Sequence, residues 1–94
     1  MAVMAKDPGA TLDYRFDWSA NYLQGTEKLL SASFSVSPNE AGGLVLGTSG
    51  FNDISSWANL SGGLKNHRYR LTCSITTDSG RADDRSLIVR VQER

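Results

Sequence analysis

Apolar and polar residues alternate one for one in four separate segments of this 94-residue chain, and this pattern constrains the fold more than any other feature. Successive side chains of a β-strand point to opposite faces of the sheet, so such alternation is typical of a strand with one buried face. In residues 12–18 the apolar residues occupy the even positions, and residues 30–36, 69–76 and 87–92 show the same period. We expect one strand in each segment.

Turn-forming residues divide the rest of the chain at strand-length intervals, and no ten-residue stretch has a clean helical period. Between the clear strands the sequence predicts a short strand over residues 44–46, a turn over 47–50, and one or two strands over 51–60. About seven short strands in this length predict an all-β, immunoglobulin-like antiparallel β-sandwich. A small β-barrel is the alternative.

The predicted core consists of large side chains on the apolar faces of these strands, each contributing ~1.5–3 kcal/mol when fully buried. Tyr69 follows a glycine-containing turn and enters an alternating strand, so we expect a tyrosine corner, in which the hydroxyl bonds to the backbone a few residues upstream. The predicted core residues are Tyr14, Phe16, Trp18, Phe34, Trp57, Tyr69, Leu71, Cys73, Ile75 and Val89.

Length and composition limit the class of protein. The chain suits one domain, predicted over residues 11–94, and residues 1–10, with the turn signal Asp7-Pro8-Gly9, are predicted to form a flexible leader. The single cysteine cannot make an internal disulfide. Ten basic and ten acidic residues give a net charge of zero, which argues against diffuse attraction to nucleic acid or membranes. No signal-peptide or membrane-spanning pattern is present, which favours synthesis in a cytoplasm.

The stretch 61–87 contains the only histidine and the only cysteine, yet we predict no catalytic, cofactor-binding or metal site there. Cys73 is in phase with the apolar residues beside it and should face the core as an inert thiol. His67 falls in a connecting loop, and one cysteine with one histidine cannot complete a structural zinc site. An enzyme that pairs His67 with Cys73 or a serine is therefore the least favoured hypothesis.

The charged residues near the C-terminal end have ordinary interpretations. Asp78, Asp83 and Asp84 lack the order of a calcium loop, and the interleaved Arg81 and Arg85 predict charge compensation within a solvent-exposed hairpin. A local basic patch is conceivable if the strands bring three arginines together, which the sequence does not decide. Its members are Arg68, Arg70 and Arg90.

Several short motifs, in order, resemble one known family. They are Asp7-Pro8, Leu12-Asp13-Tyr14, Asp17-Trp18, Thr76-Thr77, Gly80-Arg81 and Asp84-Arg85-Ser86. Nearly the whole chain resembles a family of small tailed-phage structural proteins that includes fiber-tail adaptors. The resemblance implies an immunoglobulin-like, non-enzymatic bacteriophage virion protein without cofactors. It also implies an adaptor role, in which several copies in a symmetric assembly join tail or head-tail parts to a fiber or neighbouring structural protein, with no membrane or nucleic-acid partner.

The residues that contact such a partner are not predicted individually. The serine face at Ser31, Ser33, Ser35 and Ser37, the last strand running to Arg94, and the two termini are the candidate contact elements. The alternative function is an immunoglobulin-like module that binds carbohydrate or protein through exposed aromatic residues. Tyr22, Phe51 and Trp57 are the candidates for that role.

Overall fold

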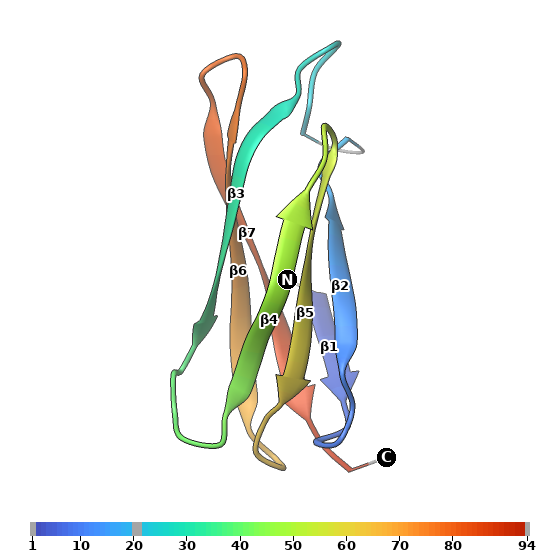
Figure 1. Cartoon of the computed structure of the whole chain (residues 1–94), viewed down its shortest axis with the longest axis vertical. Coiled ribbons are helices and arrows are strands. Elements are labelled where there is room, and N and C mark those ends of the chain that lie inside the picture. The colour runs from blue at the N-terminus through green and yellow to red at the C-terminus, as the bar shows by residue number, and fades with distance from the viewer. Residues whose placement is uncertain (1, 20–21, 94) are drawn as a thin grey trace.

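The computed structural model describes residues 2–19 and 22–93, and in these residues it contains seven strands and no helix. The strands form two sheets that pack face to face (Figure 1). This confirms the predicted all-β architecture and two-sheet arrangement. The strands are β1 (Ala2–Lys6), β2 (Leu12–Asp17), β3 (Leu29–Ser37), β4 (Leu44–Phe51), β5 (Ser55–Gly62), β6 (Arg68–Thr77) and β7 (Ala82–Val91).

The four-stranded sheet has the order β1-β7-β6-β3, and the three-stranded sheet has the order β2-β5-β4. All strand pairs are antiparallel except β1 with β7. The orders β3-β6-β7 and β2-β5-β4 correspond to the CFG and BED sheets of immunoglobulin domains. In the constant-type immunoglobulin sandwich the first strand joins the BED sheet, whereas here β1 joins the other one.

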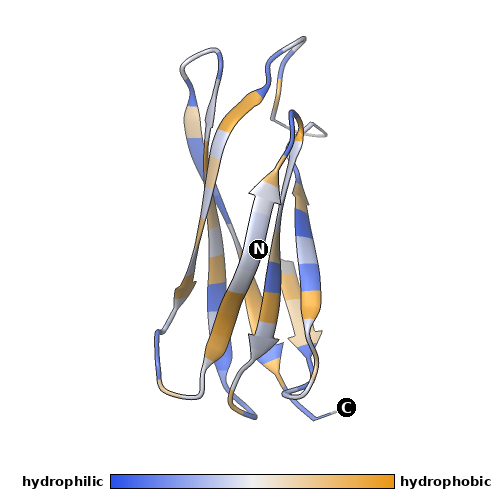
Figure 2. Ribbon diagram, viewed as in Figure 1, coloured by the Kyte–Doolittle hydropathy of each residue, from blue (hydrophilic) through white to orange (hydrophobic). Residues whose placement is uncertain are grey.

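The alternating pattern of the sequence becomes the two faces of each sheet, visible as alternating bands of hydropathy along the strands (Figure 2). Both sheets contribute to one core, and the rings of Phe16 on β2 and Phe34 on β3 meet edge to face across the two sheets at 6.2 Å. The buried core residues are Phe16, Trp18, Leu29, Leu44, Leu60, Tyr69, Leu71, Cys73, Ile75, Leu87, Val89 and Val91.

Nine of the ten predicted core residues lie in or against this core, and Trp57 does not. Tyr14 and Phe34 are half-buried and pack on it, whereas the other seven are buried. In β5 the inward positions belong to Ser56, Ala58 and Leu60, so Trp57 points to the opposite face. The prediction failed because serine and alanine give the inward side of β5 little hydrophobic signal.

The N-terminal segment also differs from its prediction. The sequence predicts a flexible leader over residues 1–10, but Ala2–Lys6 form β1 and pair in parallel with residues 87–91 of β7. The side chain of Lys6 is fully buried, and its Nζ donates hydrogen bonds to the carbonyl oxygens of Gly62 at 2.7 Å and Asp7 at 2.9 Å. Burial lowers the pKa of Lys6. Met1 and Arg94, the outer limits of the predicted segments, lie outside the described residues.

Two further local predictions are wrong because the register shifts within a strand. Residues 47–50 do not form a turn but continue β4, which has an irregularity between Leu46 and Ser49. The alternating period of residues 30–36 predicts that Leu30 faces the same way as Phe34, yet Leu30 is 61% exposed, because β3 shifts its register on β6 between Leu29 and Ser31. An extra residue in one strand reverses the faces of the residues that follow it.

Candidate interaction surfaces

The histidine and the cysteine do not form a reactive pair. Cys73 is fully buried in β6, where its Sγ lies 3.2 Å from the Ser56 Oγ, and burial raises the pKa of its thiol. His67 is exposed in the turn before β6. The six residue steps between them correspond to roughly 20 Å of extended strand, far beyond hydrogen-bond reach. Cys73 therefore behaves as a core residue, as its register predicts.

Tyr69 forms the tyrosine corner that the sequence predicts. Its hydroxyl accepts a hydrogen bond from the Leu64 backbone N–H at 3.0 Å, five residues upstream, and donates to the Glu40 Oε1 at 2.6 Å. The Nδ1 of His67 lies 2.9 Å from the same oxygen. These contacts with Tyr69 and His67 lower the pKa of the Glu40 carboxyl. The cluster joins the β3–β4 loop to the β5–β6 turn, and the sequence analysis missed Glu40.

Replacing Tyr69 with phenylalanine is expected to lower the free energy of unfolding by about 1–2 kcal/mol, because the Leu64 N–H and the Glu40 carboxylate both lose the tyrosine hydroxyl as a partner. Tyr14→Phe is the matched control, since within the described residues no hydrogen bond of the Tyr14 hydroxyl is recorded. Equilibrium denaturation of both variants measures the difference. Equal losses for the two variants would show that the corner contributes nothing specific.

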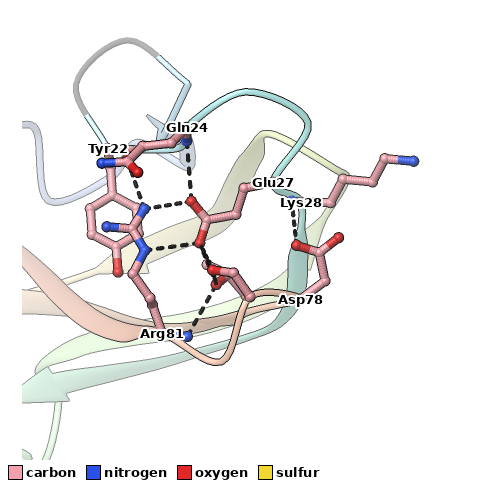
Figure 3. Close-up of polar contacts among 8 residues, drawn as sticks. Tyr22, Gln24, Glu27, Lys28, Asp78 and Arg81 are labelled. Carbon is pink, nitrogen blue, oxygen red and sulfur yellow. Dashed lines mark hydrogen bonds and ion pairs between the residues drawn. The ribbon is translucent and has the colours of Figure 1, made fainter.

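Glu27 makes the densest polar cluster of the molecule (Figure 3). Its carboxylate accepts two hydrogen bonds from the Arg81 guanidinium, at 2.9 Å from Nε and 2.5 Å from Nη2. The hydroxyls of Thr77 and Ser79 and the backbone N–H of Gln24 donate to it as well. These contacts, that of Arg81 first, hold the pKa of Glu27 well below its ordinary value. Glu27 joins the β2–β3 loop to the β6–β7 hairpin.

Both arginines of the hairpin have partners outside it. Arg81 binds Glu27 and lies over the Tyr22 ring, with 4.3 Å from its Cζ to the ring centroid. Arg85 lies over the Trp18 ring at the same distance and donates to the Asp17 carbonyl oxygen. The predicted charge compensation within the hairpin is therefore a minor contribution. Asp83 adds a weak attraction to Arg81, whereas the main partners of both arginines are a carboxylate and aromatic rings from other parts of the chain.

The outer face of the three-stranded sheet carries Trp57, half-buried between its neighbours on adjacent strands. The Arg15 guanidinium of β2 lies 4.7 Å from the Trp57 ring centroid. On the β4 side, a Cβ added at Gly50 would lie 2.9 Å from Cζ2 of Trp57, so only glycine leaves room for the ring. Gly50 therefore serves the packing of the Trp57 ring within a strand and is not part of a turn.

The three aromatic residues proposed for carbohydrate binding do not form one platform. Trp57 lies on the outer sheet face, and Phe51 is 40% exposed at the end of β4. Tyr22 belongs to the β2–β3 loop, where Arg81 covers its ring and Trp18 contacts it at 5.6 Å between centroids. No observation on these side chains favours a sugar-binding function.

The outer face of the four-stranded sheet is lined by hydroxyls and ends in a cluster of arginines. Ser31 pairs with Thr76 at 2.6 Å between hydroxyl oxygens, and Thr72 pairs with Ser86 at 2.9 Å. The structure does place Arg68, Arg70 and Arg90 together at one end, since Arg68 and Arg90 are cross-strand partners. Beside them is a hollow of about 180 Å³, lined by Asn66, His67, Arg68, Arg90, Val91 and Gln92.

Comparison with known proteins shows which family this chain belongs to. Residues 6–90 match the family described as Podophage GP4 fiber-tail adaptor protein gp77. The chain belongs to this fiber-tail adaptor family. No curated protein matches it. Membership confirms the resemblance that the ordered motifs carry.

The motifs that carry the resemblance have structural roles in this chain. Trp18 of the Asp-Trp motif donates its Nε1–H to the Ser56 Oγ at 3.0 Å in the core. Arg81 of the Gly-Arg motif binds Glu27, and Arg85 of the Asp-Arg-Ser motif covers Trp18. In this chain these residues therefore form a loop framework, in which arginines pack on aromatic rings at one end of the sandwich.

The described residues were compared with the geometry of a metal site and with the length of a membrane-spanning helix. Residues 2–19 and 22–93 contain no group of three or more histidine, cysteine or acidic side chains positioned to hold a metal ion. In the same residues no helix is long and apolar enough to span a membrane. The side chains that could act as reactive groups, such as Cys73, His67 and Glu27, take part in structural contacts.

Edge strands are the remaining candidates for partner contact. The edges of the two sheets are β1 and β3, and β2 and β4. The serines of β3 project from its sheet face, so pairing along this edge would use the β3 backbone. The predicted use of the last strand as an edge is wrong for residues 87–91, because β1 covers β7 there.

Proposed function

We propose that this protein is a non-enzymatic virion component that joins a tail or head-tail part of a phage particle to a fiber or neighbouring structural protein. The observation that carries the proposal is the match of residues 6–90 to the fiber-tail adaptor family. The structure is compatible with this role, because the side chains most suited to catalysis are engaged in structural contacts. Cys73 is inside the core, and Glu27 and Arg81 neutralise each other.

An adaptor acts through surface complementarity and copy number rather than through a reactive group. Weak contacts repeated around a symmetric particle add to high avidity, provided that several can form at once. We propose that this protein is present in several copies per particle, and that exposed strand edges supply main-chain hydrogen bonds to its partners. Its place of action is the virion, after synthesis in the host cytoplasm.

The proposal is tested on phage particles that encode this chain. Mass spectrometry of purified tails should detect the protein in a fixed ratio to the tail and fiber proteins, and particles lacking it should lose the fiber. Its absence from intact tails would sink the proposal. Fiber retention in particles that lack it would equally contradict the adaptor role.

A further inference from the structure

The arginines at one end of the four-stranded sheet are a cationic cluster without partners of their own. Arg68 and Arg70 follow one another on the outer face of β6, and Arg90 lies directly opposite Arg68 on β7. All three side chains are exposed. None has a carboxylate within ion-pair distance among the described residues. Like charges directly opposite each other destabilise a sheet, so an anionic partner would relieve this repulsion.

The other end of the same two strands carries the opposite charge. Asp78, Asp83 and Asp84 are exposed around the β6–β7 hairpin, at the top of Figure 1, and the arginine cluster lies near the lower end of the sandwich. The two hairpin arginines bind elsewhere, Arg81 to Glu27 and Arg85 over Trp18. Asp83 lies opposite the buried Ile75, on the side of the hairpin that carries Arg81, whereas Asp84 lies on the outer face. Over the residues that the structure covers, Asp78 and Asp84 have no ion-pair partner.

The two groups do not neutralise each other within one molecule. Six residue steps separate Asp84 from Arg90 along β7, which is roughly 20 Å at ~3.3 Å per residue. This distance exceeds the Debye length of ~8 Å at physiological ionic strength, so attraction between them is largely screened. On this outer face the arginines and Asp84 thus lie at opposite ends, although the net charge of the whole chain is zero.

We propose that this outer face is an interface between copies of this chain, in which the arginine cluster of one copy binds the hairpin aspartates of the next. The charge complementarity is present on the molecule itself, with three cations at one end and the carboxylates of Asp84, on the outer face, and Asp78, in the turn, at the other. Between them the face carries small hydroxyl side chains, such as Thr72 and Ser86, and the partly exposed Ile88. The hollow beside Arg68 and Arg90 offers space for an aspartate side chain.

A second copy fits this face better than a nucleic acid does. Proteins that bind single strands combine cations with exposed aromatic rings that stack on bases. The aromatic residues of β3 and β6, Phe34 and Tyr69, point toward the core, and the hairpin aspartates would repel a phosphate backbone. The inference depends on the proposed function only in that a virion adaptor is present in several copies.

Charge reversal tests the contact on the purified full chain by sedimentation velocity. The wild-type protein should show a weight-average mass that rises with concentration and returns to 10.2 kDa in about 0.5 M salt. Reversal of the basic end, R68E with R90E, should weaken self-association at least about tenfold, and so should D78R with D84R. Because the two variants have complementary ends, an equimolar mixture should associate again.

The matched control reverses two exposed lysines outside the arginine cluster, K28E with K65E, and changes the net charge as much as the first variant does. This control should self-associate like the wild type. It should associate with the D78R/D84R variant more weakly than R68E/R90E does, because only its hairpin end is complementary to that variant. A wild-type chain that is monomeric up to about 1 mM would overturn the proposal. Failure of the mixture to associate, or binding of a DNA duplex that R68E/R90E abolishes, would overturn it too. These outcomes are independent of whether the protein is found in tails.

Discussion

Replacing Trp18 with alanine is expected to lower the free energy of unfolding by about 3–5 kcal/mol. The Trp18 side chain is fully buried, and its ring contacts Phe16, Tyr22 and the Arg85 guanidinium. Truncation leaves a cavity and removes the donor that binds the Ser56 Oγ. Typical domains are stable by only ~5–15 kcal/mol, so the melting temperature should fall on the order of 12 °C or more.

Trp57→Ala is the matched control, because the chain has two tryptophans and they lie in opposite environments. Trp57 is only half-buried on the outer sheet face, and its main loss would be the contact with Arg15. We expect a cost of about 1 kcal/mol or less. Thermal unfolding followed by circular dichroism compares the two variants. A larger loss for Trp57→Ala than for Trp18→Ala would contradict the assignment of the two rings to outside and inside.

The clear strands were predictable because their inward residues are large. Residues such as Leu71 and Val89 alternate with polar neighbours, and this signal depends only on local geometry. In β5 the inward residues include Ser56 and Ala58, which are too small or too polar to reveal the period, so Trp57 was assigned to the wrong face. In β1 the inward position is held by Lys6, a residue type that normally indicates exposure.

The loop contacts could not be predicted for a different reason. Glu27 and Arg81 are 54 positions apart, and Glu40 meets Tyr69 across 29 positions. Periodicity reports how a residue faces within its own strand and contains no information about which distant loop lies beside it. The arginine cluster shows the same limit, since the sequence suggests its members but only the register of β6 on β7 brings Arg68 and Arg90 together.

The Gly-Arg and Asp-Arg-Ser motifs acquire a physical explanation from these contacts. Arg81 donates to the Tyr22 carbonyl oxygen in the β2–β3 loop, and Arg85 lies over the Trp18 ring. Both arginines therefore hold the hairpin in place and have a structural role. The consequence concerns the acidic tip of the hairpin. Because its arginines have their main partners elsewhere, the exposed Asp84 stands on an ordered hairpin without an ion-pair partner among the described residues.

Replacing Glu27 with glutamine is expected to destabilise the protein at neutral pH and to change its response to acid. The side chain of Glu27 is only 5% exposed, and glutamine keeps its size while leaving Arg81 without a counterion. The folded state holds the pKa of Glu27 well below its ordinary value of 4.5, through Arg81 first and then Ser79 and Thr77. The stabilisation from this carboxylate is therefore fully present above about pH 4.5 and is lost as the pH falls toward the folded-state value.

Urea denaturation at about pH 7 and about pH 3 measures this effect. The difference in stability between the wild type and Glu27→Gln should be largest at the higher pH and shrink at the lower one. Glu93→Gln is the control, because Glu93 pairs with Lys65 at 3.1 Å on the exposed surface, where ion pairs contribute little. If both glutamine variants behave alike, or if the difference does not depend on pH, Glu27 does not hold the two loops together electrostatically. A double-mutant cycle with Arg81→Met then isolates the pair, and strong coupling between the two positions is the expected result.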